Sequence, residues 1–257
     1  MEPLVSIIVN CKNGSKYLKK CLTSIKNQKF KDWEIIFFDN NSSDNSYEIF
    51  HEIKDERFRY FKSKNNETLY KARNLACNQA KGKYLAFLDT DDWWHEEFLN
   101  SRVFFLNEGS YDFFYSNTLC YIEKKNKYKK YKNYQLPSGL IYKDLAIDYF
   151  IIISGLIVKK IIFEKENYFN DIYNIIGDYD FVMRISKYSK GHAMNNNLIF
   201  YRIHNENFSK LNTETFFNEY NYWYKQQEIL NDEYFLENKK YFKKKLLELE
   251  INFLLLN

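Results

Sequence analysis

The first hundred residues alternate between short apolar runs and segments with helical periodicity. The apolar runs, rich in Ile, Val, Phe and Tyr, are typical of buried strands and occupy residues 4–10, 33–39, 58–61 and 83–89. Between them, residues 16–28 and 69–82 place apolar side chains on one helical face. Strands separated by helices need crossover connections, so the pattern predicts an α/β fold with a mostly parallel sheet flanked by helices.

The alternation is less regular after residue 100. Residues 111–122 predict one long strand, and residues 197–204 predict a short one. A helix with one apolar face begins near Asp178, and from Phe216 onward the chain has a helical pattern. We therefore expect the sheet to be followed by a C-terminal helical extension.

Composition narrows the classes of function. The chain has 38 Lys plus Arg against 34 Asp plus Glu, a net charge of only +4, so no nucleic acid partner is expected. With 7 Gly and 2 Pro, the chain is neither collagen-like nor a Gly/Pro-rich disordered protein. A dehydrogenase is also disfavoured, because Gly14 is the only glycine in the first 80 residues and no GxGxxG motif is present.

Cysteines and apolar stretches indicate the compartment. The 4 cysteines are far apart and form no CxxC pair, which gives no support to a zinc or redox site and suits a reducing compartment. The N-terminus does not resemble a signal peptide, and the longest apolar stretch, residues 149–158, is about half a membrane span. We expect a cytoplasmic protein, with contact at the inner face of the plasma membrane left open.

Acidic residues follow two of the predicted strands, where an open parallel sheet binds ligands. Asp39 ends one apolar run, and Asp89, Asp91 and Asp92 follow another. Three carboxylates within four residues repel one another unless a cation compensates, and Mg²⁺ or Mn²⁺ does so while also binding phosphates. The alternative is an acidic turn that caps a helix starting near Trp94. The spacing alone leaves both interpretations open.

Four segments, in consistent order, resemble family 2 glycosyltransferases with the GT-A fold. Residues 5–46 resemble the opening of that family, and residues 72–94, which begin with ARN and contain DTDD, resemble its next segment. GDYDF (177–181) is similar to the catalytic segment, and YRIHNENFS (201–209) to a closing motif. The resemblance implies one GT-A domain over residues 1–205, with a helical region over 206–257.

The resemblance also implies roles for individual residues. Residues 1–100 would form the nucleotide-sugar-binding half and 101–205 the acceptor-binding half. The residues that would bind the nucleotide or its phosphates are Asn10, Lys12, Asp39, Arg73, Asp89, Thr90 and Arg202. Asp91, the second acid of the DxD motif, would hold a divalent metal, Mn²⁺ or Mg²⁺, together with His204. A lone histidine is also often structural.

Asp178 aligns with the catalytic base of the family. The expected reaction moves a sugar from a nucleotide-diphosphate donor, a UDP-sugar first of all, to a hydroxyl of a glycan or lipid-linked acceptor, with inversion. A cation would stabilise the leaving diphosphate and Asp178 would take the hydroxyl proton. Asp180 is the alternative base. Gly177 stands where the family usually has an acid, which keeps open a degenerate binding or scaffold protein. A sugar-1-phosphate nucleotidyltransferase is disfavoured, because its Gly-rich N-terminal motif is missing.

Two further regions have alternative interpretations. Residues 124–134 combine lysines with tyrosines. They form either a solvated loop or strand, or a surface that docks an anionic acceptor such as a lipid diphosphate. The apolar faces of residues 206–257 suit core packing or a homodimer, with membrane attachment as the alternative. Packing is favoured because acids outnumber lysines there. The resemblance suggests a role in surface polysaccharide or lipo-oligosaccharide assembly.

Overall fold

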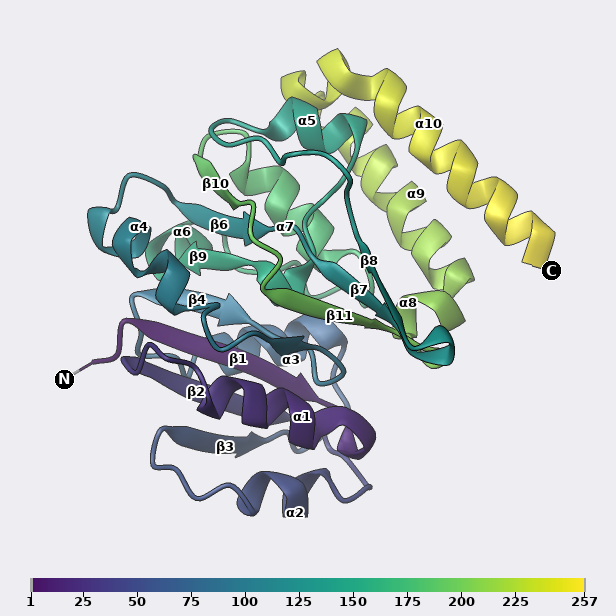
Figure 1. Ribbon diagram of the computed structural model, residues 1–257. Helices are drawn as coiled ribbons and strands as arrows, with labels where there is room; N and C mark the ends of the chain where they lie inside the picture. The colour runs from purple at the N-terminus through teal and green to yellow at the C-terminus, as the bar shows by residue number, and fades with distance from the viewer. Residues whose placement is uncertain (1, 257) are drawn as a thin grey trace.

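The computed structural model describes residues 2–256, with side chains as far as residue 254, and its main layer is a seven-stranded sheet within that range (Figure 1). The strand order is β10-β6-β9-β4-β1-β2-β3. Their bounds are β1 (Val5–Cys11), β2 (Trp33–Asp39), β3 (Phe58–Lys62), β4 (Tyr84–Phe87), β6 (Phe113–Ser116), β9 (Ile157–Lys159) and β10 (Gly191–Met194). Only β9 runs antiparallel to its neighbours among these strands, which confirms the mostly parallel α/β sheet.

Helices cover both faces of the sheet, as expected for crossover connections. The first three are α1 (Ser15–Lys26), α2 (Ser46–His51) and α3 (Leu69–Cys77). Successive side chains of a strand point to opposite faces, and accordingly Ile7 shares a core with Leu22 of α1, whereas Ile8 shares the other core with Ala76 of α3. The four apolar positions predicted for the α1 face are all buried.

A second sheet lies beside the main one, and it corrects two predictions. Its order is β5-β11-β7-β8, with bounds β5 (Trp93–Trp94), β11 (Ile199–Ile203), β7 (Leu119–Ile122) and β8 (Lys127–Lys130). The single long strand expected over 111–122 is wrong, because the chain changes sheets between β6 and β7. At this point Asn117 Oδ1 accepts the backbone amides of Thr118, at 2.9 Å, and Lys132, at 3.2 Å.

The second correction concerns the acidic segment. The helix expected to begin near Trp94 is absent from the described chain at that place, since Trp93 and Trp94 pair with β11 as β5. The indole of Trp94 donates to the carbonyl oxygen of Ser154 at 2.7 Å, which fixes the side chain in the core. The next helical residues are a short 3-10 helix, Asn100–Arg102, which leads into α4 (Val103–Glu108). The acids at 89–92 therefore do not cap a helix.

The remaining helices lie in the second half of the chain. They are α5 (Tyr142–Ile147), α6 (Lys160–Lys165), α7 (Gly177–Ile185), α8 (Phe208–Leu211), α9 (Thr213–Ile229) and α10 (Glu233–Leu256). In Figure 1, α9 and α10 lie together against α5 and α7. Trp223, Phe235 and Phe242 belong to the same apolar core as α7, so the expected C-terminal helices pack on the sheet domain. Within residues 2–256, no helix has the length and apolar character needed to span a membrane.

Candidate active site

The carboxyl ends of β1 and β2 place two of the expected residues side by side. The Asp39 carboxylate is buried and accepts hydrogen bonds from the Tyr60 hydroxyl, at 2.6 Å, and the backbone amide of Ser42, at 2.7 Å. Asn10 is in register one step before Asp39 on the neighbouring strand. Its side-chain Nδ2 and Oδ1 are shielded from solvent, yet neither has a hydrogen-bond partner among the described residues. Lys12 is exposed beyond the strand end.

The Asp89 carboxylate, directly after β4, is paired with Arg73 of α3. The Arg73 guanidinium is buried, donates to Asp89 Oδ1 and lies 4.9 Å from the centre of the Tyr70 ring. Burial raises the pKa of Asp89, and the Arg73 charge opposes that rise. This pair leaves Asp89 oriented rather than free to move.

Asp91 points toward the loop that follows β11. Its Oδ2 lies 3.0 Å from His204 Nε2 and 3.4 Å from Asn207 Nδ2. His204 Nδ1 accepts the Glu206 backbone amide at 3.2 Å, so a neutral ring carries its proton on Nε2 and donates it to Asp91. In this arrangement His204 orients Asp91 and leaves Asp91 Oδ1 available to a cation.

Asp92 differs from its two acidic neighbours, because the protein satisfies both of its oxygens. Oδ2 accepts the Ser154 hydroxyl at 2.5 Å, and Oδ1 accepts the Arg202 backbone amide at 2.8 Å. Burial, followed by the charges of Asp91 and Asp89, raises its pKa well above the usual range. Asp92 therefore ties the acidic segment to β11, a role that the sequence did not separate from those of Asp89 and Asp91.

Two expected donor-binding residues lie next to the start of α1. Arg202 donates from Nε to the Asp91 carbonyl oxygen at 3.0 Å, but its guanidinium extends toward α1 and pairs with Glu123 at 3.1 Å. Thr90 is half-buried, and its hydroxyl lies about 3.0 Å from where a Cβ on Gly14 would stand. Gly14 thus allows the start of α1 to approach the acidic segment closely.

The Asp178 carboxylate, in the first turn of α7, faces α3. Its Oδ1 accepts the Tyr70 hydroxyl at 2.6 Å. Burial raises the pKa of Asp178, while the Tyr70 hydrogen bond and the Arg73 charge oppose that rise. Contacts therefore run from Asp178 through Tyr70 and Arg73 to Asp89, and bring the α7 carboxylate to the same edge as the β4 acids.

The Tyr70 ring also accounts for Gly177. A Cβ built on Gly177 would overlap that ring, so no side chain fits at this position while Tyr70 stays in place. The absence of an acid at this position left open the interpretation as a degenerate scaffold. The Tyr70 ring occupies the space of that side chain, and its hydroxyl donates to Asp178. No local pattern pointed to Tyr70, because it is 108 residues away from Asp178 along the chain and its side chain is buried.

Asp180, the alternative base, lies on the opposite side of α7. Residues two apart do not share a helical face, and Asp180 instead pairs with Arg184, whose Nε is 3.0 Å from its Oδ2. Arg184 continues to the carbonyl oxygen of Tyr168 at 2.8 Å. Asp180 is therefore part of a structural ion pair beneath α7.

A residue from the C-terminal region holds the segment before α7. The Glu219 carboxylate of α9 accepts three consecutive backbone amides, those of Asn174 at 2.7 Å, Ile175 at 2.9 Å and Ile176 at 3.1 Å. These amides precede the turn that carries Asp178, so α9 fixes where α7 begins. Nothing in the local pattern around Glu219 distinguishes it from an exposed helical acid.

Comparisons with known proteins identify the family and the fold. The chain is 30% identical over 206 residues to the UDP-Glc:alpha-D-GlcNAc-diphosphoundecaprenol beta-1,3-glucosyltransferase WfaP of Escherichia coli, covering 78% of each chain. A structure of TarS from S. aureus in complex with UDP-GlcNAc aligns with a TM-score of 0.72 at 19% identity, over 98% of this chain and 73% of that one. In another TarS structure the chain spans 63% of the length.

A mannosyltransferase structure, PcManGT from Pyrobaculum calidifontis with GDP-Man and Mn²⁺, aligns with a TM-score of 0.66 at 12% identity, over 94% of this chain and 70% of that one. These structural likenesses establish a GT-A-like fold. The model of the family described as "Glycosyl transferase family 2" matches residues 6–188, which is most of the chain. Together with the identity to WfaP, this match shows that the chain is a glycosyltransferase that belongs to family 2.

Proposed function

We propose that this enzyme transfers a sugar from a UDP-sugar to a hydroxyl of a glycan or lipid-linked acceptor, in a metal-dependent reaction that inverts the anomeric centre. The observation that carries the proposal is the chain of contacts that joins Asp178 to Asp89 through Tyr70 and Arg73. It holds a candidate base and the acidic segment at one edge of the sheet. The relative WfaP is named for a UDP-Glc donor and a diphosphoundecaprenol acceptor, which supports the proposed substrate classes.

The donor nucleotide is proposed to bind at the ends of β1 and β2. A shielded amide without partners is unusual, because buried polar groups are nearly always hydrogen-bonded. The Asn10 amide would gain its missing partners from the base, and Asp39, held by Tyr60, would accept from the base or ribose. Lys12 and Thr90 would contribute charge or contacts around the phosphates, whereas the Arg202 guanidinium is directed toward α1 and Glu123 and does not serve the phosphates as expected.

The residues present suit a divalent cation that is shared with the donor. No cluster of three or more His, Cys, Asp or Glu side chains around a common point exists in residues 2–256. Mg²⁺ is commonly held by one or two carboxylates plus substrate phosphates, and Asp91 Oδ1 supplies one such ligand. For His204 to join it, the ring proton must move to Nδ1 and the bond from the Glu206 amide must be released. When bound, the cation would neutralise charge on the leaving diphosphate.

Asp178 is proposed as the general base. Its Oδ1 is engaged by Tyr70, so the acceptor proton would pass to Oδ2. A raised pKa brings a carboxylate nearer to the operating pH, where a base is most effective, and the Tyr70 hydrogen bond limits the rise so that the ionised form persists. Attack from the face opposite the diphosphate inverts the anomeric carbon without a covalent intermediate. The four cysteines are free and buried, which suits the proposed cytoplasmic location beside the membrane.

The test is release of UDP from a panel of UDP-sugars with Mn²⁺, for the wild type and Asp91→Ala. We expect turnover with at least one donor, and a loss of about 10³-fold in the variant, because the metal supplies several kcal/mol. Asp91→Ala should also lose Mn²⁺-dependent UDP binding in calorimetry. Unchanged Mn²⁺-dependent binding would contradict the metal role, and UDP binding without turnover of any donor would favour a scaffold.

A further inference from the structure

An aromatic platform covers the outer face of the second sheet, away from the carboxylates. We define it by one ring from each strand: Trp93, Phe200, Tyr121 and Tyr128. The Trp93 and Phe200 rings are parallel within 7°, with centres 5.1 Å apart. Tyr121 lies 5.7 Å from Trp93, and Tyr128 lies 5.0 Å from Tyr121. Trp93 pairs with Phe200 and Tyr121 with Tyr128 across the strands, so the pairing register itself aligns the rings.

A cavity of about 830 Å³ lies between this platform and α1. Its walls include Trp93 and Phe200 on one side and Lys16, Lys19 and Lys20 of α1 on the other. Sites for small ligands are concave, mostly apolar and carry a few placed polar groups, with volumes of about 300–1,000 Å³. The cavity has such a volume, but its lining is more polar, with Lys, Thr, Ser, Asn, His, Glu and Arg side chains around Trp93 and Phe200, which suits a hydrophilic ligand. The proposed reaction uses none of its aromatic rings.

Two cations share the same aromatic rings at one end of the cavity. Lys20 Nζ lies 3.3 Å from the centre of the Trp93 ring and 5.9 Å from that of Tyr121, and the Arg202 guanidinium lies 4.8 and 5.5 Å from the same centres. Burial and then the Arg202 charge lower the pKa of Lys20. Glu123 pairs with Arg202, whereas Lys20 has no carboxylate partner in the described part of the chain. Like charges held together are relieved by a bound anion.

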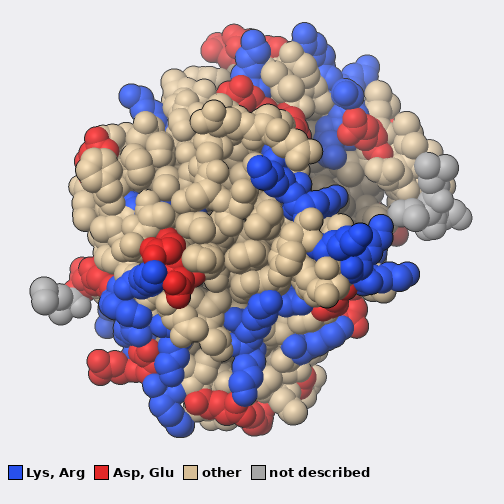
Figure 2. Space-filling model, in the orientation of Figure 1, with Lys and Arg blue, Asp and Glu red and all other residues tan. Residues whose placement is uncertain are grey.

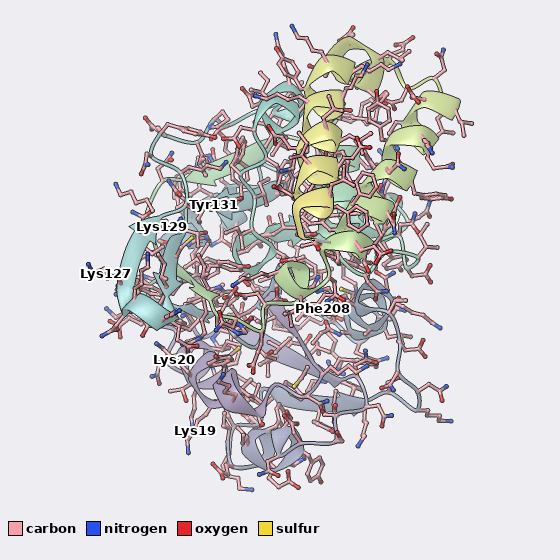
Figure 3. All side chains as sticks on the ribbon, turned by 90° about the vertical axis from the view of Figure 1, so that its right-hand side faces the viewer. Lys19, Lys20, Lys127, Lys129, Tyr131 and Phe208 are labelled. Carbon is pink, nitrogen blue, oxygen red and sulfur yellow. The ribbon has the colours of Figure 1, made fainter. Side chains whose placement is uncertain are left out.

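Apart from Glu123, the acids near the cavity pair with lysines other than Lys20. Glu52 pairs with Lys19, Glu96 with Lys29, and Glu206 with Lys16. Figure 2 shows Lys and Arg side chains gathered over α1 and over the hairpin of β7 and β8 on this face. In Figure 3, Lys19, Lys20, Lys127 and Lys129 follow one another along one edge of the molecule. A face lined with one sign of charge raises the local concentration of anions.

We propose that this cavity binds a saccharide unit that carries a phosphate or carboxylate group. The anion would lie between Lys20 and Arg202, and the apolar face of the sugar would lie on the aromatic platform. A bilayer fits less well, because the cations line a hollow and Trp93 is only 7% exposed, so it does not project outward as a membrane-inserting side chain does. Resting on the proposed function, we assign this saccharide to the acceptor glycan.

Arg202 connects the cavity with the acidic segment. Its Nε donates to the Asp91 carbonyl oxygen at 3.0 Å, while its guanidinium forms part of the cavity wall. An anion bound beside Arg202 would therefore lie on one side of the segment, and the proposed donor phosphates on the other. This arrangement would hold the acceptor and the donor on a common rigid element.

The test measures binding without donor or metal, by tryptophan fluorescence and NMR titration. The probes are glucose 1-phosphate and glucuronate, compared with glucose and inorganic phosphate. We expect both anionic sugars to bind more tightly than either comparison compound, and Lys20→Ala to weaken them about 10-fold or more, as loss of a charge-assisted hydrogen bond does. Lys20→Arg should restore binding. Lys26→Ala is the matched control, since Lys26 is exposed on the same helix but is not among the residues that line the cavity, and it should bind normally.

Equal affinity in the wild type and Lys20→Ala would overturn the proposal. Phosphate that binds as tightly as glucose 1-phosphate would overturn its saccharide part. Co-sedimentation with phosphatidylglycerol vesicles that depends on Lys20, while sugar binding does not, would assign the cavity to the membrane instead. Because these measurements need no turnover, failure of the proposed transferase reaction would show in the UDP-release assay and leave the binding result intact.

Discussion

The segment from Asp89 to Trp94 separates two regions of opposite character. On the side of α3 and α7, carboxylates meet donors from the protein, as Asp89 meets Arg73 and Asp178 meets Tyr70. On the side of α1, cations lie on aromatic rings, and Lys20 has no acid beside it within the described residues. The difference shows that one short stretch of chain can present a site suited to a cation on one side and a site suited to an anion on the other.

The donors on the acidic side orient the carboxylates without removing their charge. A hydrogen bond to an ionised carboxylate favours the charged form and fixes its rotamer. The rings on the basic side have a different effect, because a cation over an aromatic face gains some stabilisation while keeping its capacity to bind an anion. On the acidic side the protein therefore fixes the positions of its carboxylates. On the basic side, Lys20 keeps a charge that no carboxylate of the described residues neutralises.

The largest expected effect comes from removing the base on the acidic side. Asp178→Asn should keep UDP-sugar binding and lower kcat by about 10²- to 10⁴-fold, the usual contribution of a general base. Burial raises the pKa of Asp178 above its unfolded value, so ionisation at neutral pH opposes folding, and the amide should not lower the melting temperature. Calorimetry, UDP release and thermal melts test the three statements.

Asp180→Asn is the matched variant on the same helix. It breaks the ion pair with Arg184 but leaves Asp178 in place, so it should affect kcat far less than Asp178→Asn does. The reverse pattern, with near-normal turnover for Asp178→Asn, would move the base to Asp180.

A smaller effect is expected when the donor to Asp178 is removed. Tyr70→Phe deletes the hydroxyl that favours the charged carboxylate, so the pKa of Asp178 should rise further. The acid limb of the kcat/KM profile should then move to higher pH by about one to two units, because a hydrogen bond to a charged group contributes about 1.5–3 kcal/mol. A lower rate with an unmoved pH limb would mean that Tyr70 only supports the packing of α3 and α7.

The smallest effect concerns the basic side. Glu123→Gln removes the carboxylate that pairs with Arg202, so the affinity for glucose 1-phosphate should increase, by less than the loss expected for Lys20→Ala. Stability should decrease, because the Arg202 guanidinium is buried and loses its carboxylate partner. Weaker binding in Glu123→Gln would indicate that Glu123 positions Arg202 for the ligand rather than competing with it.

Local patterns predicted the elements whose side chains repeat within a few residues. The buried strands at 4–10 and 33–39 and the apolar face of α1 are in this class. The strand expected over 111–122 failed because periodicity does not show that Asn117 takes over backbone hydrogen bonds where the chain changes sheets. A helix near Trp94 failed for a related reason, since two tryptophans pair with a strand a hundred residues away.

The candidate site divides in the same way. Asp39, Asp89 and Asp91 could be proposed as site residues because they stand at or shortly after the ends of β2 and β4. Asp92 could not be separated from them, because its partners come from residues 154 and 202. The aromatic platform has no local signal at all, since each ring comes from a different strand. Roles that depend on long-range contacts are visible only in the folded chain.

The three hydrogen bonds from the loop before α7 to Glu219 have a consequence for the modular use of this protein. A chimera that replaced everything after residue 205 with a foreign helical pair would deprive Asn174, Ile175 and Ile176 of their acceptor. The exchanged helices could still cover the apolar core, yet α7, which carries the proposed base, would lose its anchor. Residues after 205 should therefore be exchanged only for helices that keep a carboxylate at the position of Glu219.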